Sequence, residues 1–290
     1  MKKNRKAWLR RIVITVVVMT LLCGMTANAE VVTVIPQYYI VVNRATNHVD
    51  VYTHDAAGQY NIPVIEFTCS TGKNNKTPKV ETEISQKILF HEMNGEVYSQ
   101  YAVRFYKGCM FHAVPCDERQ KDTLKTNYYN QLGEQASSGC VRLAAADAEW
   151  IYNNCEIGTK VKVIDDPDDM GPFGKPMVPK IKDGHPYANW DPTDSAPNNP
   201  WINERPMVKL VANATDGTTL SLPAGTSYKA FYASMGLFAP SGEAYAGGNY
   251  ALDIYGVYDL KTKGTYTLYV RGHDLATTLR GDLTVTLNVY

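Results

Sequence analysis

The sequence predicts a mainly β protein with two β-rich domains. Short segments of alternating apolar and polar residues recur in the first half of the chain, only one stretch there favours a helix, and the alternation returns near the C-terminus after a proline-rich stretch. The expected boundaries are 1–29 for a leader, 30–166 for the first domain, 167–204 for a linker and 205–290 for the second domain.

The first 29 residues have the composition of a secretory signal peptide. Residues 1–11 carry six basic side chains and no acidic one, residues 12–25 are almost wholly apolar, and residues 27–29 form an A-x-A cleavage site. The apolar run is shorter than the roughly 20 residues that a spanning helix needs, so a retained membrane anchor is the weaker alternative. A lipid anchor on Cys23 is weaker still, because a bulky leucine precedes it. We therefore expect a secreted protein with no stable membrane span after cleavage.

Charge excludes some functions. The whole chain has 29 basic and 29 acidic residues, and the leader holds six of the basic ones, so the mature chain carries 23 − 29, or −6. Nucleic-acid binding requires a basic face, so the negative net charge of the mature chain argues against that class. A P-loop, a dinucleotide glycine fingerprint and an H-E-x-x-H helix are also missing from the sequence.

In the first domain, strands are expected on both sides of a turn at residues 43–48, and a helix is expected near its end. The helix candidate begins with strong helix formers and ends in asparagines. The expected strands are 39–42, 49–52, 64–68 and 160–164, and the expected helix is 147–154.

The proline-rich stretch and the second domain differ in composition. Eight prolines lie between residues 165 and 204, so we expect an extended linker without a core of its own, either free or packed on the first domain. Segments 265–270 and 283–289 alternate polar and apolar residues, which predicts a small β-sandwich. Residues 261–268 resemble the end of bacterial Ig-like domains. The aromatic side chains of this domain suit either glycan stacking or core packing.

Cys140 is the candidate nucleophile. It follows a small-residue turn, Ser137-Ser138-Gly139, and a helix-like segment was expected directly after it. A free thiol with a pKa near ~8.5 is mostly protonated at neutral pH, and a helix N-terminus or an imidazolium lowers that value. The backbone N–H groups of residues 138–140, Ser138 and Gly139 among them, are the candidate oxyanion donors.

His112 is the candidate base, because it ends an apolar strand-like run, Cys109-Met110-Phe111. The alternative is a histidine that serves only the core. Ser137 is the candidate group to orient the imidazole, through its hydroxyl or its carbonyl.

Five cysteines remain after cleavage, so at least one thiol is free or pairs between chains. With Cys140 free, Cys69, Cys109, Cys116 and Cys155 could pair in three ways or stay reduced. A zinc site from Cys109, His112, Cys116 and Cys140 is disfavoured, because residues three apart on a strand point to opposite faces.

These residues resemble the YkuD-type L,D-transpeptidases of the Firmicute branch, which cross-link peptidoglycan. The family signature begins with a histidine and a spacer of variable length. A consecutive run follows: Ser or Thr first, then His, Gly, Cys and a hydrophobic residue, and usually Arg or Asn last. This chain has His112, Ser137, Gly139, Cys140, Val141 and Arg142. The resemblance covers residues 38–166 and implies a YkuD-like β-sandwich or barrel with a short helix after the cysteine.

The chain departs from the family pattern in three places. Ser138 replaces the second histidine, the spacer contains an inserted loop at residues 117–130, and Val80 replaces the glycine of a Thr-Pro-x-Gly turn. The base is retained in His112, so these departures concern the fit of substrate more than the chemistry.

The resemblance implies an acyl transfer from peptidoglycan tetrapeptide stems. Cys140 would attack the carbonyl of the third residue and release D-alanine, with His112 as base and acid. Arg142 would brace the turn or meet a substrate carboxylate. Carbapenem inhibition at Cys140, location at the cell wall, and no metal or organic cofactor are implied as well. Hydrolysis, which would make the protein an L,D-carboxypeptidase, and a non-catalytic wall-binding role remain as alternatives. The stretch that holds Glu92, Asn94, Tyr98 and Tyr101 is a candidate flap over the cleft, and the favoured alternative is that each of the four is a surface turn residue.

Overall fold

A computed structural model describes residues 35–176, 178, 180–210, 219–239, 241–244, 250–256, 258–274 and 280–290. The predicted signal peptide lies outside this part of the chain. Within it, no helix is both long and apolar enough to cross a membrane.

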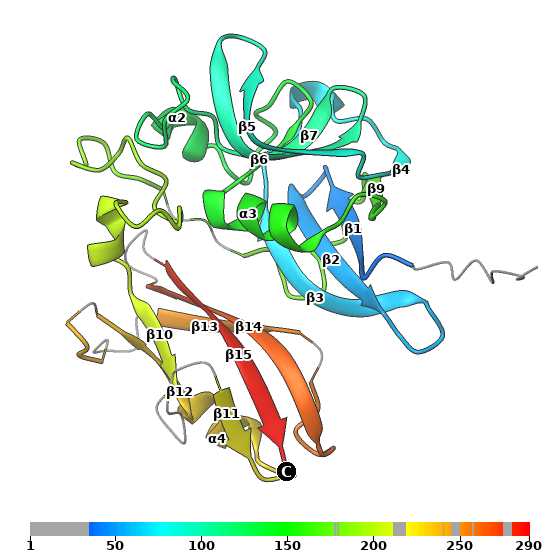
Figure 1. Cartoon of the computed structure of the whole chain (residues 1–290), viewed down its shortest axis with the longest axis vertical. Helices are drawn as coiled ribbons and strands as arrows, with labels where there is room; N and C mark the ends of the chain where they lie inside the picture. Colours follow the sequence, from blue (N-terminus) through cyan, green and yellow to red (C-terminus); the bar gives the residue numbers. More distant parts are fainter. Residues whose placement is uncertain are drawn as a thin grey trace, which may run out of the picture. The chain divides into compact units, whose positions relative to one another are not determined.

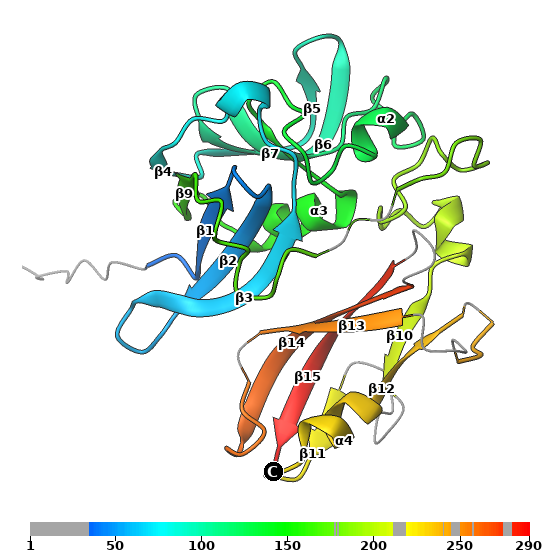
Figure 2. The same cartoon turned by 180° about the vertical axis from the view of Figure 1, so that it is seen from behind.

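The first half of the chain forms two β-sheets (Figures 1 and 2). One sheet has the strand order β3-β2-β1-β9-β4 and the other the order β5-β6-β7-β8. The first sheet consists of β1 (Tyr38–Asn43), β2 (His48–His54), β3 (Tyr60–Thr68), β4 (Glu81–Glu83) and β9 (Lys160–Ile164). The second consists of β5 (Gln86–Met93), β6 (Val97–Tyr106), β7 (Cys109–Ala113) and β8 (Val141–Leu143). The predictions of a mainly β fold and of strands at 39–42, 49–52, 64–68 and 160–164 are confirmed.

The core of this half is filled by side chains from both sheets and from helix α3 (Ala145–Asn154). Apolar residues alternate along the strands, so one face of each strand enters the core, as the period of two requires. The helix packs against β6 and β7, which places Ile151 in the same core. Representative fully buried members are Ile40, Val42, Val51, Phe67, Val103, Phe111, Val141, Leu143 and Val161.

The expectation that a helix begins at Cys140 is wrong. Cys140 is followed by strand β8, which pairs in parallel with β7, and α3 begins only at Ala145. Val141 and Leu143 are fully buried while Arg142 between them is not, which is strand alternation. The thiol therefore has no helix N-terminus behind it.

The proline-rich stretch packs on the first half of the chain, which is one of the two alternatives given above, but the expectation that it buries no core is wrong. Trp190 and Trp201 pack with Tyr129 of helix α2 (Thr126–Tyr129) in a second cluster, and a 3-10 helix spans Pro200–Asn203. Buried carboxylates satisfy the backbone here: Asp191 accepts hydrogen bonds from the N–H groups of Ala145 and Thr193. Local side-chain hydrogen bonds replace the secondary structure that proline prevents.

The C-terminal part has its own sheets and core. Strands β10 (Met207–Leu210) and β12 (Met235–Phe238) pair with each other, and the second sheet has the order β11-β15-β14-β13. Its strands are β11 (Thr219–Leu222), β13 (Tyr250–Tyr255), β14 (Gly264–Asp274) and β15 (Arg280–Val289), and helix α4 spans Tyr228–Ala233. Val208 and Leu237 of the small sheet share a core with Leu268 and Leu287 of the larger one. The assignment to the Ig-like class and the predicted domain boundaries stay predictions.

Buried ion pairs connect this part to α3. The carboxylate of Asp147 on α3 lies 2.8 Å from the guanidinium of Arg271 and 3.2 Å from that of Arg280. All three side chains are nearly inaccessible to solvent, so the charges compensate one another.

Candidate active site

A cleft of about 450 Å³ contains the predicted nucleophile and base. It is bordered by the β5–β6 hairpin, by β7 and by the turn Ser137–Cys140. The residues around it that matter for chemistry are His91, Glu92, Asn94, Arg104, Cys109, His112, Ser138, Cys140 and Arg142. Sequence reasoning placed Cys140 and His112 together, and both line this cleft.

The turn before Cys140 is held by hydrogen bonds from a neighbouring loop. Gly139 has φ +140°, a conformation that favours glycine, and an added Cβ would lie 3.3 Å from the carbonyl oxygen of Lys76. The hydroxyl of Thr77 donates to the carbonyl of Gly139 at 2.9 Å and accepts from the N–H of Gly72 at 2.7 Å. Thr77 is fully buried, so this contact fixes the turn that presents Cys140.

The thiol of Cys140 lies against the turn between β6 and β7. Its Sγ is 3.7 Å from the carbonyl oxygen of Gly108. Burial raises the pKa of Cys140, and the N–H of Met110 and the charges of Arg142 and Arg104 oppose that rise. The resting sulfur is therefore a protonated thiol at neutral pH, with donors and cations in place for a thiolate that forms during reaction.

His112 is buried on β7 and has a fixed orientation. Its Nδ1 lies 2.7 Å from the carbonyl oxygen of Ala113, and because a carbonyl only accepts, Nδ1 carries the proton. Burial lowers the pKa of His112 to about 4, and the positive charge of Arg142 adds to that effect. The imidazole is neutral at physiological pH, and its Nε2 keeps a lone pair that can accept a proton.

The predicted role of Ser137 is not the one that its contacts support. Its hydroxyl donates to the carbonyl of Cys140 at 2.6 Å and accepts from the N–H of Gly139 at 3.0 Å, and its carbonyl accepts from the N–H of Lys73. The carbonyl of Ala113 orients His112 instead. Ser137 therefore shapes the turn, and it also occupies the Gly139 N–H that was predicted to help stabilise an oxyanion.

Arg142 braces the turn and faces the cleft. Its guanidinium lies 4.3 Å from the centre of the Tyr128 ring, and Nη1 donates to the carbonyl of Ala136 at 3.3 Å. Tyr128 belongs to α2 in the predicted inserted loop, so this loop supports the site. Ser138 is exposed at the edge of the cleft.

The predicted flap residues separate into two groups. Glu92 and Asn94 lie at the tip of the β5–β6 hairpin and line the cleft. Tyr98 instead pairs with Cys116 beneath the hairpin, and the hydroxyl of Tyr101 donates to Glu149 on α3. The hairpin tip alone is therefore placed to contact a ligand.

All five cysteines in the described part are free thiols. Cys69, Cys116 and Cys155 are buried, and burial raises the pKa of each. Cys109 lines the cleft near Cys140. Sequence reasoning missed Arg104 and the amide of Met110, since neither has a local signal. Thr77 was noticed only as part of a divergent loop.

Comparisons with known proteins agree with the motif. Residues 37–163 match the family model of the YkuD L,D-transpeptidase catalytic domain. YciB of Bacillus subtilis, a protein assigned to the L,D-transpeptidases, is 44% identical over 54 residues, which cover 19% of this chain and 27% of that protein. The chain thus matches about a quarter of this curated relative's length.

Two solved structures from Mycobacterium tuberculosis are also similar. An L,D-transpeptidase from strain H37Rv is 24% identical, with 45% of this chain and 58% of that chain covered and a TM-score of 0.33. L,D-transpeptidase 3, in complex with a faropenem-derived adduct, is 21% identical, with 44% and 60% covered and a TM-score of 0.32.

Proposed function

We propose that this protein is a cysteine-dependent L,D-transpeptidase that forms 3-3 cross-links in peptidoglycan, because residues 37–163 match the family model of the YkuD L,D-transpeptidase catalytic domain. The observation that carries the proposal is the cleft in which the Cys140 thiol and an imidazole of fixed tautomer both lie. The substrates are tetrapeptide stems, which a protein exported to the cell wall would meet.

The first step transfers the stem to the enzyme. The S–H proton of Cys140 passes to Nε2 of His112 as the sulfur bonds to the carbonyl carbon of the third stem residue. Collapse of the tetrahedral intermediate breaks the C–N bond to D-alanine, and His112 returns the proton to the departing amine. The product is a thioester on Cys140.

The second step transfers the acyl group to an acceptor. A side-chain amine of a neighbouring stem attacks the thioester carbon, His112 takes a proton from that amine, and the thiolate leaves and is reprotonated. The N–H groups of Ser138 and Cys140 are the proposed oxyanion donors, because the Gly139 N–H is already bonded to Ser137. Arg142 offsets the developing negative charge near the sulfur.

Water is the competing acceptor. If water intercepts the thioester, the protein releases D-alanine without cross-linking and acts as an L,D-carboxypeptidase. The β5–β6 hairpin tip, with Glu92 and Asn94, borders the cleft and is the segment proposed to admit the acceptor stem. A wall-binding role without catalysis is the remaining alternative.

Mass spectrometry of protein and products tests the proposal. The native protein, Cys140→Ala and Cys109→Ala would each be incubated with tetrapeptide muropeptides and, separately, with a carbapenem. Cys109 also lines the cleft, which makes it a matched control for loss of a thiol. We expect a covalent adduct and dimeric stems with the native protein and with Cys109→Ala, and neither product with Cys140→Ala.

The other outcomes are distinct. Monomeric stems shortened by one D-alanine would indicate the carboxypeptidase. An adduct that persists in Cys140→Ala would place the nucleophile elsewhere. A folded native protein without adduct or turnover would contradict the enzymatic proposal and favour wall binding.

A further inference from the structure

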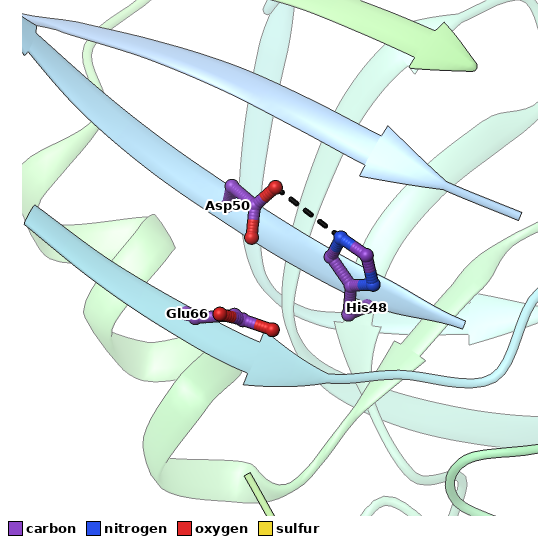
Figure 3. Close-up of side chains that lie close together, drawn as sticks. All are labelled: His48, Asp50 and Glu66. Atoms are coloured by element: carbon purple, nitrogen blue, oxygen red, sulfur yellow. Dashed lines mark ion pairs between the residues drawn. The ribbon is translucent and has the colours of Figure 1, made fainter. Parts of the chain in front are cut away.

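Three ionisable side chains meet on the sheet that does not form the cleft. His48 and Asp50 lie two residues apart on β2 and so project from the same face, and Glu66 on β3 is the cross-strand partner of Asp50. Figure 3 shows the three side chains gathered between these two strands. None of the three lines the cleft of Cys140.

Burial makes this arrangement costly as it stands. His48 and Glu66 are 0% exposed and Asp50 is 1% exposed. Two carboxylates that face each other directly across a strand pair repel, and little water is present to screen them. A positive charge at this place, carried by a proton or by a metal ion, would relieve the repulsion.

Each of the three side chains also keeps one polar atom without a hydrogen-bond partner among the described residues. These atoms are Nε2 of His48, Oδ1 of Asp50 and Oε1 of Glu66. The remaining polar atoms of His48 and Glu66 are occupied, since Nδ1 of His48 lies 2.8 Å from the Thr46 hydroxyl and Oε2 of Glu66 accepts from the N–H of Phe173 at 3.1 Å. Nε2 of His48 lies within ion-pair distance of Asp50, and buried polar atoms are rarely left unpaired, so the free oxygens of Asp50 and Glu66 in particular point to a ligand.

The segment 166–175 closes the site from outside the sheet. Asn43 at the end of β1 donates to the carbonyls of Asp166 and Asp169 at 2.7 and 3.1 Å. Gly171 has φ +79°, and a Cβ there would lie 2.5 Å from Oε1 of Glu66, so the backbone is in close contact with this carboxylate.

We propose that His48, Asp50 and Glu66 bind one divalent transition-metal ion, with Zn²⁺ as the representative, and that the ion fixes segment 166–175 to the sheet. One ligand atom from each residue lies within 4.8 Å of the others. Nε2 of His48 is 3.3 Å from Oδ2 of Asp50, which matches the separation of about 3.4 Å between tetrahedral ligands with bonds of roughly 2.0–2.2 Å.

The donor set selects the class of ion. Two carboxylates and a neutral imidazole balance a charge of +2, and an imidazole nitrogen suits Zn²⁺ and its neighbours better than Mg²⁺ or Ca²⁺. The Thr46 hydroxyl and the Phe173 N–H would then orient the ligands from behind, as outer-shell hydrogen bonds do in metal sites. The ion would be structural, because these residues lie apart from the reacting groups.

Metal analysis and thermal unfolding test the proposal. We expect about one equivalent of metal in protein purified without chelator, and we expect Zn²⁺ added to chelator-treated protein to raise its melting temperature. At about a hundredfold excess over the dissociation constant, the rise should be roughly 5–10 °C. Co²⁺ in place of Zn²⁺ should give visible d–d bands without the near-ultraviolet band of a thiolate ligand.

Isosteric variants locate the site. Glu66→Gln and Asp50→Asn should each lose the metal and the Zn²⁺-dependent shift, whereas the control His54→Gln, on the same strand but outside the cluster, should keep both. Asp50→Asn removes one charge of a repelling pair, so it remains informative if Glu66→Gln does not fold. The proposal is overturned if the native protein shows neither metal nor shift, if the variants respond like the native protein, or if Co²⁺ shows thiolate ligation at the cysteines.

Discussion

The two fully buried histidines of the first domain lie in opposite electrostatic surroundings. His112 on β7 is 2% exposed and His48 on β2 is 0% exposed, and each has Nδ1 in contact with a fixed oxygen. Burial lowers the pKa of His112 to about 4, with Arg142 and His91 adding positive charge. Burial also lowers the pKa of His48, but Asp50, Glu66 and Asp169 raise it by more, so the net shift is upward.

The difference shows that burial alone does not assign a role to a histidine. At His112 burial keeps the ring neutral and the charge of Arg142 adds to that effect, which leaves Nε2 able to accept the proton of a thiol. At His48 the neighbouring carboxylates favour a positive charge, whether it is carried by a proton or by a metal ion. The following predictions test this contrast, from the largest expected effect to the smallest.

Replacement of His112 should have the largest effect. His112→Gln keeps the hydrogen bond to Ala113 within reach but removes the proton acceptor, so carbapenem acylation of Cys140 should slow by about 10²- to 10⁴-fold. His54→Gln on β2 serves as the control and should acylate at the native rate. The rates would be followed by intact-protein mass spectrometry. Native-like acylation of folded His112→Gln would remove His112 from the mechanism.

The depressed pKa of His112 should also make stability depend on pH. Between pH ~4 and ~6.5 the unfolded chain binds a proton at this residue that the folded chain does not, so stability from this group rises with pH across that window. The contribution amounts to about 3 kcal/mol at most. Urea unfolding at several pH values should show a shallower dependence in His112→Gln than in the native protein. Parallel curves for the two proteins would contradict the low pKa.

The thiol of Cys140 should react as a protonated group. Burial raises its pKa, so alkylation by iodoacetamide should quicken about tenfold per pH unit from pH 7 up to a midpoint above the usual thiol value of ~8.5. Peptide mass spectrometry would separate Cys140 from Cys109, and Cys140→Ala supplies the blank. A rate that is already constant from pH 6 to 8 would instead indicate a preformed thiolate–imidazolium pair.

The smallest effect is expected at Thr77. Thr77→Val removes the hydroxyl that joins Gly72 to Gly139, which should cost about 1–3 kcal/mol of stability and slow acylation by less than about tenfold. Thr82→Val is the matched control, because its hydroxyl bonds Phe105 away from the turn. Equal acylation by the two variants would show that Thr77 does not position Cys140.

Much of the fold could be predicted from the sequence, because its signals are local. The strands at 39–42, 49–52 and 160–164 and the helix at 147–154 follow from side-chain periodicity and helix-ending residues, and all are present. The predicted helix start after Cys140 was wrong. The strand that follows has only three residues, which are too few to show the alternation of a strand. The core of the proline-rich stretch could not be predicted for another reason, because Trp190 and Trp201 contact elements that are distant in the sequence.

The sequence by itself was enough to predict Cys140 as the nucleophile and His112 as the base, because Cys140 follows a turn that requires glycine and His112 belongs to a recognisable motif. Only the tertiary structure decided how they are tuned: strand pairing and burial bring Arg142, Arg104 and the Met110 amide to the sulfur and leave His112 neutral. The cluster of His48, Asp50 and Glu66 likewise could not be predicted from the sequence. Its members converge through strand register and through a covering segment more than 100 residues away, and neither has a local signal.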